Sequence, residues 1–288
     1  MNDIRLIASD VDGTMLPRGG VISENLKRAI VLCRERGIPF IIASGRWIGA
    51  MGDVLAQSGC VGMPLIIANG AAILGGDGQP LREWFLNDAD ARKVYDILRR
   101  FDVQINGYGR GALYCLNTAA LKRRSSMIDS YIGGAGHRLV LENREIFEME
   151  GLHNAYKLEA LSENPDIVAG VQDALKDCGL SVTHSSARNV EIMAKGVNKG
   201  AALTWLADYL QIPAANCMAF GDNMNDYDLL AAAGWPVAVG NADPALKKIA
   251  RIVAPADVDD GVAKTIYKII DNGKWIMEND GANPCGFD

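Results

Sequence analysis

The feature that most constrains the fold of this chain is a repeated unit: a short apolar run, a polar loop and a segment with apolar residues at helical spacing. The run Ile4 to Ala8 predicts a buried parallel strand, and Ser23 can cap a following helix that Gly37 ends. The apolar runs Phe40 to Ala43 and Leu65 to Ala68 begin the next units. Strand, loop, helix and strand in this order predict a parallel sheet with crossover helices.

The pattern changes in the middle of the chain, where helices and strands are separated by polar turns in the manner of an α+β domain. After Gly196 the first pattern resumes. We therefore expect an α/β fold whose parallel-sheet core comprises residues 1–85 and 193–288, with an inserted α+β domain at residues 86–192. Further expected elements are a helix carrying Ile48, Met51 and Leu55, a hairpin from Ala72 to Phe85 around Asp77-Gly78, a helix from Ala89 to Phe101, strands Val103 to Asn106, Leu113 to Leu116 and Val190 to Met193, a helix from Lys199 to Leu210, strand Met218 to Phe220, a helix from Asp226 to Ala233, strand Val237 to Val239 and a loosely ordered tail from Asn272.

Composition narrows the class of partner. Charged residues make up 22% of the chain and the formal net charge is −6, so no broad basic surface is expected for nucleic acid or anionic lipid, and the expected partner is small. The six cysteines are scattered singly, which is typical of reduced thiols. The N-terminus carries no secretory pattern and no apolar run approaches a membrane span, so we expect a soluble, cytoplasmic protein; its oligomeric state stays open.

Acidic residues accumulate after two of the predicted strands. Asp10 and Asp12 follow the first strand, and Asp222 and Asp226 follow a late one. Ligands of open parallel sheets bind beyond the carboxyl ends of the strands, where clustered carboxylates repel one another unless a cation joins them. Oxygen-only ligands favour Mg²⁺ over zinc. Alternatively, these aspartates cap helices and turns, which explains part of the role of Asp226 but not the accumulation of acids.

Two other loops should lie at the same edge. Ser44-Gly45-Arg46 follows the second strand, and Lys199 opens a late helix beside Gly196 and Gly200. Without its neighbours, Lys199 is typical of a solvated surface lysine. Arg46 either steers an anionic ligand or pairs with a core carboxylate.

Taken together and in this order, these motifs resemble the haloacid dehalogenase superfamily. They are Asp10-Val11-Asp12-Gly13-Thr14, Ser44-Gly45-Arg46, Lys199 and Gly221-Asp222-Asn223-Met224-Asn225-Asp226. Within that superfamily, Ile67-Ala68-Asn69-Gly70-Ala71, Gly196-Val197-Asn198-Lys199-Gly200 and Val239-Gly240-Asn241-Ala242 resemble the Cof-type sugar-phosphatase branch. The resemblance covers nearly the whole core and implies a Rossmann-like sheet, with the insert as a large cap between the second and third motifs.

The resemblance implies a magnesium-dependent phosphatase of small phosphate monoesters, such as sugar phosphates. Asp10 would attack phosphorus to give an aspartyl-phosphate, and Asp12 would protonate the leaving alkoxide and then activate water. Mg²⁺ would be held by the Asp10 carboxylate, the Asp12 carbonyl and Asp222, with Asp226 in support. Phosphoryl oxygens would be bound by Val11, Ser44, Gly45, Lys199 and Asn225.

Two alternatives remain from the sequence. A sugar phosphomutase resembles this core and uses two such aspartates, and a non-catalytic sugar-phosphate sensor would keep the fold for binding alone. The specificity of the cap is also open. Its polar and aromatic candidates are Tyr108, Arg110, His184 and Arg188, with a place in a solvated loop as the alternative for each. His137, His153 and His184 make no metal-ligand spacing with cysteines.

Overall fold

The structure is a computed structural model that describes residues 4–17, 19–115, 138–141 and 153–270. It separates into two compact units, and each is described by itself. The first comprises residues 1–42, 54–63 and 204–288, and the second comprises residues 43–53 and 64–203. Among the described residues, no helix has the length and apolar character needed to cross a membrane. The expected tail from Asn272 lies outside the described residues, and the expected domain limits at 86 and 192 stay a prediction.

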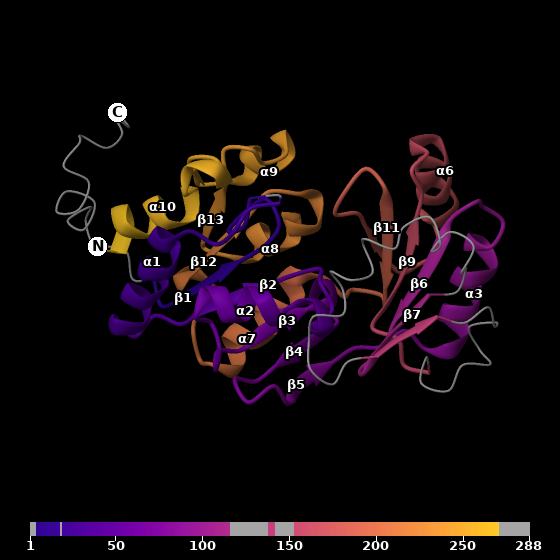
Figure 1. The fold of residues 1–288 in the computed structure, drawn as a ribbon, viewed down its shortest axis with the longest axis horizontal. Helices are drawn as coiled ribbons and strands as arrows, with labels where there is room; N and C mark the ends of the chain where they lie inside the picture. The colour runs from indigo at the N-terminus through magenta and orange to yellow at the C-terminus, as the bar shows by residue number, and fades with distance from the viewer. Residues whose placement is uncertain (1–3, 18, 116–137, 142–152, 271–288) are drawn as a thin grey trace. The chain divides into compact units, whose positions relative to one another are not determined.

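The first unit contains a parallel sheet in the order β14-β13-β12-β1-β2. Its helices α1 and α10 lie beside each other in Figure 1, and the Tyr267 hydroxyl donates to the Asn25 carbonyl oxygen between them. The elements are β1 (Leu6–Ser9), α1 (Glu24–Glu35), β2 (Phe40–Ala43), α2 (Gly52–Ser58), η4 (Ala214–Asn216), β12 (Cys217–Gly221), η5 (Met224–Asp226), α8 (Tyr227–Ala232), β13 (Trp235–Ala238), α9 (Pro244–Ile249), β14 (Ile252–Val253), η6 (Asp257–Asp259) and α10 (Gly261–Ile270). The predicted parallel-sheet core is confirmed.

Local signals explain how this unit begins. The Ser23 hydroxyl accepts a hydrogen bond from the Leu26 amide and so caps α1, and Gly37 follows the helix with a φ of 68°. Every residue of β1 and β2 is buried, as expected for inner strands of a parallel sheet. In the register, Ser9 of β1 lies opposite Phe220 of β12. The loops that follow these two strands therefore leave the sheet at the same edge.

The second unit contains two sets of strands. The first is an antiparallel ladder of β3, β4 and β5, with a turn at Gly78 as predicted. The second is a six-stranded sheet in the order β10-β11-β9-β6-β7-β8. The elements are η1 (Ile48–Ala50), β3 (Leu65–Ile67), η2 (Ala68–Gly70), β4 (Ala72–Leu74), β5 (Pro80–Glu83), α3 (Asp88–Leu98), β6 (Gln104–Tyr108), β7 (Ala112–Cys115), β8 (Arg138–Leu141), β9 (Lys157–Leu161), α6 (Pro165–Leu175), β10 (Ser181–Thr183), β11 (Asn189–Met193) and the start of α7 (Lys199–Tyr209).

The two faces of the six-stranded sheet differ in chemistry. Helices α3 and α6 cover one face (Figure 1), where Ile105, Leu158 and Ile192 belong to an apolar cluster. The opposite face carries polar side chains at alternate positions of β6, β9 and β11, and all of them are buried: Gln104, Asn106, Tyr108, Lys157, Glu159, Asn189 and Glu191. Alternating patterns usually place the polar face in water, so this burial is the main surprise of the fold.

One expected helix differs in form. Ile48 begins a 3₁₀ turn, η1, which ends before Met51, and Leu55 lies in the short helix α2 that follows. The ring of Trp47 lies against Gly49, where a Cβ would come within 2.0 Å of a ring carbon. This contact holds the first turn against Trp47, and the regular helix starts only at Gly52.

Candidate active site

The loop after β1 is a tight turn that presents Asp10. The Val11 carbonyl accepts hydrogen bonds from the amides of Thr14, Met15 and Leu16, at 3.3, 3.1 and 2.9 Å. Asp10 is buried, with 6% of its surface exposed, whereas the side chain of Asp12 is exposed. The two aspartates of this loop therefore have different environments: one is enclosed and the other can exchange protons with solvent.

Three buried carboxylates meet beyond the ends of β1 and β12. One carboxylate oxygen from each of Asp10, Asp222 and Asp226 lies within 4.8 Å of the other two. Three negative charges at this separation in a buried place repel strongly unless a cation or protons offset them. The donor set contains oxygen alone, which suits a hard divalent cation such as Mg²⁺. These residues therefore fit the expected metal, and the Asp12 side chain is not part of the cluster.

Asp226 also has the capping role that the sequence suggested. Its Oδ2 accepts hydrogen bonds from the backbone amides of Asp222 at 3.1 Å and Asn223 at 3.2 Å. The side chain thereby holds the loop that carries Asp222, and Gly221 allows the approach because a Cβ there would lie 2.5 Å from the Asp226 Cβ. Asn225 is half-buried in the same turn, η5.

Two residues without an expected role support this cluster. Thr14 is buried, and its hydroxyl donates to Oδ1 of Asp222 at 3.0 Å. Asn241 donates from Nδ2 to the Gly13 carbonyl oxygen at 2.7 Å, while its Oδ1 accepts from the Asp257 amide at 2.9 Å. The signal for Asn241 was its position after Gly240, at the end of another parallel strand.

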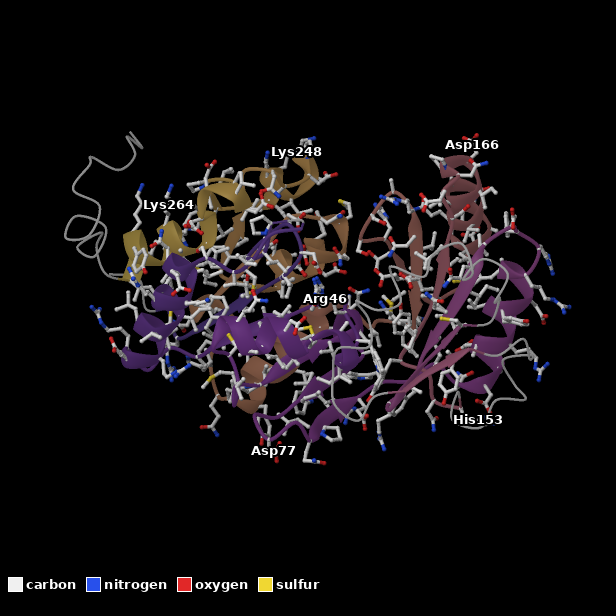
Figure 2. The ribbon with its side chains drawn as sticks, viewed as in Figure 1. Arg46, Asp77, His153, Asp166, Lys248 and Lys264 are labelled. Carbon is white, nitrogen blue, oxygen red and sulfur yellow. The ribbon has the colours of Figure 1, made fainter. Side chains whose placement is uncertain are left out.

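In the second unit, Ser44 is the centre of a compact backbone arrangement. Its amide donates to the Ile66 carbonyl oxygen at 2.9 Å, and its hydroxyl oxygen accepts from the Arg46 amide at 3.1 Å. Gly45 is closely covered, because a Cβ there would lie 2.7 Å from Oδ1 of Asn69. The Arg46 guanidinium (Figure 2) donates to the Ala50 carbonyl oxygen at 3.2 Å, so part of its function is to close the turn.

Lys199 is fully buried at the start of α7, with 0% of its surface exposed. A solvated surface lysine is therefore excluded. The preceding Asn198 accepts a hydrogen bond from the Ala201 amide at 2.7 Å and begins the helix. Gly70 packs directly on this point, since a Cβ there would lie 2.2 Å from the Asn198 carbonyl oxygen. The buried ammonium group needs anionic or polar partners, which is the environment expected of an anion-binding lysine.

The residues that the sequence offered as candidates for substrate specificity, and the remaining histidines that the structure describes, differ in burial and in contacts. Arg110 is exposed and forms an ion pair with Glu83, and Arg188 pairs with Glu163 at 3.2 Å. His153, labelled in Figure 2, is exposed beside Asp88, and His184 is half-buried. Tyr108 is buried and donates its hydroxyl to Glu159 at 2.5 Å. His137 lies outside the described residues.

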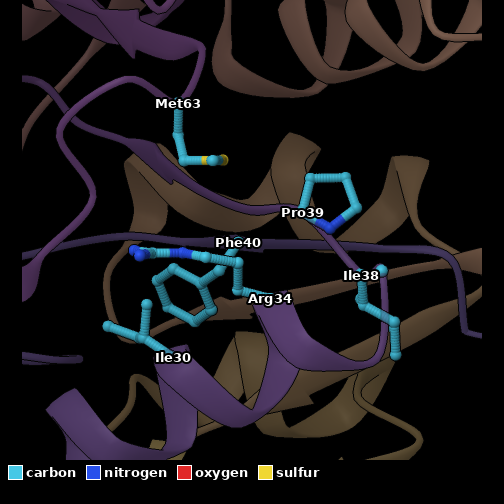
Figure 3. A pocket seen from close by; sticks show the side chains of 7 residues that line it. Ile30, Arg34, Ile38, Pro39, Phe40 and Met63 are labelled. Carbon is cyan, nitrogen blue, oxygen red and sulfur yellow. The ribbon is translucent and has the colours of Figure 1, made fainter.

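An apolar pocket of the first unit lies away from these loops. It is lined by Ile30, Arg34, Gly37, Ile38, Pro39, Phe40 and Met63 (Figure 3). Phe40 begins β2, whereas the functional loops follow the other, carboxyl ends of the strands. The Arg34 guanidinium is held by the Gly59 carbonyl oxygen at 2.7 Å. We therefore do not assign the substrate to this pocket.

The sequence profile of haloacid dehalogenase-like hydrolases matches residues 7–266, and the chain belongs to this family. The expected membership, with its Cof-type branch, and the expected enzyme class, a phosphoric monoester hydrolase, are thereby confirmed.

Two relatives of known activity match over most of their length. The chain is 29% identical to the 5-amino-6-(5-phospho-D-ribitylamino)uracil phosphatase YcsE of Bacillus subtilis, over 92% of this chain and 95% of that protein. It is 28% identical to the HMP-PP phosphatase of Yersinia pseudotuberculosis, over 85% of this chain and 86% of that protein.

Solved structures agree on the fold. A haloacid dehalogenase-like hydrolase from Bacillus subtilis superposes with a TM-score of 0.79 at 25% identity, covering 92% of this chain and all (100%) of the other. One from Bacteroides thetaiotaomicron gives a TM-score of 0.78 at 21% identity, covering 92% and 99%. The expected fold class, an α/β parallel-sheet core with an α+β insert, is confirmed.

Proposed function

We propose that this protein is a magnesium-dependent phosphatase that hydrolyses small phosphate monoesters, with sugar phosphates as the preferred class, through an aspartyl-phosphate intermediate. The observation that carries the proposal is the buried cluster of Asp10, Asp222 and Asp226 at the end of two paired parallel strands. Stability alone gives no reason to gather three carboxylates in a buried place. A site that binds a cation and a phosphate group does require such a cluster.

The reaction takes two steps on one carboxylate. An oxygen of Asp10 attacks phosphorus, the bond from phosphorus to the ester oxygen breaks, and Asp12 gives its proton to the departing alkoxide. Asp12 then takes a proton from water, which attacks the phosphorus and releases inorganic phosphate from Asp10. The exposure of Asp12 suits it to both proton transfers.

The negative charges of Asp10 and of the phosphoryl group repel each other and must be offset before Asp10 can attack phosphorus. We assign Mg²⁺ to the carboxylates of Asp10 and Asp222 and to the Asp12 carbonyl, with Asp226 in support; bound there, it would offset the negative charge of the phosphoryl group and of Asp10. We assign the phosphoryl oxygens to the amide of Val11, to Ser44 and Gly45, to Asn225 and to Lys199. The burial of Lys199 supports this assignment, because a buried ammonium attracts an anion strongly.

The proposed substrate is a small phosphorylated metabolite. The activities in the names of the two relatives both concern small phosphorylated compounds, one of them with a phosphorylated ribityl chain. We place the activity in the cytoplasm, which is supported by five described cysteines that are free thiols.

The test is a screen of phosphorylated metabolites and 4-nitrophenyl phosphate with a phosphate-release readout, with and without Mg²⁺. We expect release that depends on Mg²⁺ and that is abolished in Asp10→Asn. A phosphorylated product that appears without free phosphate, and that needs a bisphosphate activator, would indicate the phosphomutase instead. Binding of sugar phosphates with no turnover of any ester would indicate the sensor.

A further inference from the structure

Lys157 is a buried lysine that connects the six-stranded sheet to the Ser44 loop. It lies in β9 with 3% of its surface exposed. Its Nζ donates to the Gly45 carbonyl oxygen at 2.8 Å and forms an ion pair with Glu191 of the neighbouring strand β11. The same ammonium lies 4.4 Å from the centre of the Tyr108 ring. Its surroundings therefore fix its position from three directions.

The peptide group between Gly45 and Arg46 is held at both of its polar atoms. Its carbonyl oxygen accepts from Lys157, and its N–H donates to the Ser44 hydroxyl oxygen at 3.1 Å. That second bond occupies a lone pair of the hydroxyl, so the Ser44 O–H is left to donate elsewhere. Lys157 and the Ser44 hydroxyl are therefore bonded to the same peptide group.

A second contact joins the same two segments. The indole Nε1 of Trp47 donates to the Gly109 carbonyl oxygen at 2.9 Å, and its ring packs with Tyr108 and Leu113. Packing of this kind suffices to attach the segment to the sheet. The lysine is then not required as an attachment, and the cost of burying its charge calls for another explanation.

Glu159, the second buried carboxylate on this face, has its own hydrogen-bond donors. Glu159 lies opposite Glu191 in the ladder and accepts hydrogen bonds from Asn106 and Asn189 at 3.0 Å each, and from Tyr108. The Lys157 ammonium is therefore directed to Glu191 and to the Gly45 carbonyl oxygen rather than to Glu159.

We propose that Lys157 is a positioning residue for phosphate binding, held in place by Glu191, which fixes the Gly45–Arg46 peptide so that the Ser44 hydroxyl donates to a phosphoryl oxygen. The inference rests on the proposed phosphatase function. It adds two residues, both in the sheet of the second unit, to the determinants of that function.

The experiment compares Lys157→Met/Glu191→Gln with the unaltered protein. The double substitution removes both buried charges, so neither is left unpaired. Melting temperature, kcat and KM for 4-nitrophenyl phosphate, and the affinity for inorganic phosphate by calorimetry are measured. We expect a melting temperature close to that of the unaltered protein, with phosphate affinity and kcat/KM each lowered roughly tenfold, the usual effect of losing a charge-assisted hydrogen bond. A double variant with unaltered phosphate affinity and kcat/KM would overturn the proposal.

The matched control is Lys93→Met. Lys93 also donates to a backbone carbonyl oxygen, that of Cys178 at 2.9 Å, but it lies at the surface of the same unit. Its substitution should leave both phosphate affinity and turnover unaltered. If Lys93→Met lost as much as the double variant, the effect would follow from the loss of any lysine and not from the position of Lys157.

A double-mutant cycle with Ser44→Ala separates positioning from general damage. If Lys157 acts through the Ser44 hydroxyl, the double substitution should cause little further loss once that hydroxyl is absent. Fully additive losses would contradict the proposal. If Lys157→Met/Glu191→Gln fails to fold, the isosteric variant Glu191→Gln is measured alone, with an expected loss of phosphate affinity of about threefold. An unaltered phosphate affinity in Glu191→Gln would contradict the proposed role of Lys157 and Glu191.

The proposed function can fail separately. Absence of both phosphate release and phosphate binding in the unaltered protein would refute the phosphatase. A normal phosphatase whose double variant is indistinguishable from it would refute only the role of Lys157.

Discussion

Thr14 and Asp222 are 208 positions apart in the sequence, yet the Thr14 hydroxyl donates to Oδ1 of Asp222 at 3.0 Å in a buried place. One loop thereby fixes the carboxylate of the other. Thr14→Val keeps the shape and removes the donor, so we expect kcat/KM to fall roughly tenfold, as for a lost hydrogen bond to a charged group. Steady-state kinetics with 4-nitrophenyl phosphate would measure this. Thr14→Ser is the control and should retain most activity, and a fully active Thr14→Val would show that Asp222 needs no such support.

Asp12 should act as the proton donor and acceptor. Its exposed carboxyl group can protonate the alkoxide, and Asp12→Ala removes that group without touching the buried cluster. We expect kcat to fall roughly 10²- to 10⁴-fold, the usual contribution of acid–base catalysis. The loss should be smaller for 4-nitrophenyl phosphate than for an alkyl phosphate, because nitrophenolate leaves without a proton. Equal losses for both esters would contradict this role.

Gly13 is a position where a side chain should be harmful for two reasons. Its φ is +85°, and a Cβ would lie 2.5 Å from Oδ2 of Asp222. Gly19 is the matched control, because it has a φ of +73° with nothing within 4 Å of a Cβ. Backbone strain should cost each Gly→Ala variant about 1 kcal/mol of stability in urea unfolding, and Gly13→Ala should lose more because of its contact with Asp222. Activity should fall sharply in Gly13→Ala alone, and comparable activity in the two variants would be the contrary result.

Metal binding should appear in stability as well as in turnover. A cation that joins Asp10, Asp222 and Asp226 stabilises the folded state, so Mg²⁺ should raise the melting temperature in a concentration-dependent way. Asp222→Asn removes one charge from the cluster. We expect this variant to match or exceed the unaltered protein in melting temperature without Mg²⁺, because repulsion is relieved, and to show no rise with Mg²⁺. An equal rise in both proteins would place the cation elsewhere.

The buried thiols should be unreactive in the folded protein. Burial raises the pKa of the Cys33 and Cys115 thiols to about 12 and that of Cys217 to about 11, from an ordinary value of 9.0. At pH 8, iodoacetamide should modify half-buried Cys178 well before these three, as followed by mass spectrometry. Rapid modification of Cys33 in native buffer would contradict this burial.

Because of the same thiols, the stability of the folded protein should fall as the pH rises above about 9. Their folded pKa values are raised, so the folded state keeps protons that the unfolded state loses. Their contribution is therefore fully present below pH 9 and is lost as the pH rises toward 11 or 12.

The sequence predicted the elements whose signals are local. Ser23 and Gly37 mark the ends of α1 by side-chain capping and by a left-handed backbone, and both act within one helix. The turn at Gly78 was found for the same reason. The acidic cluster could also be expected, because the carboxyl ends of parallel strands meet at one edge.

The polar face of the six-stranded sheet could not be predicted. The alternation Lys157-Leu158-Glu159-Ala160 is typical of a strand with its polar side in water. Only the pairing of β6, β9 and β11 brings Lys157 to Glu191, and Asn106 and Asn189 to Glu159. The Thr14 contact was hidden in the same way, because its partner is remote in sequence. For Lys199, the neighbouring glycines favoured a functional lysine over a solvated surface one, but nothing in the sequence indicated its complete burial.

The pairing of β1 with β12 also limits how this enzyme can be re-engineered. Ser9 lies opposite Phe220, one residue before Asp10 and two residues before Asp222. Inserting or deleting one residue in either strand would shift this register and displace its carboxylate from the other. Libraries aimed at new substrates should therefore leave the number of residues unchanged in β1, in β12 and in the loops that carry Asp10 and Asp222, and vary surface loops elsewhere.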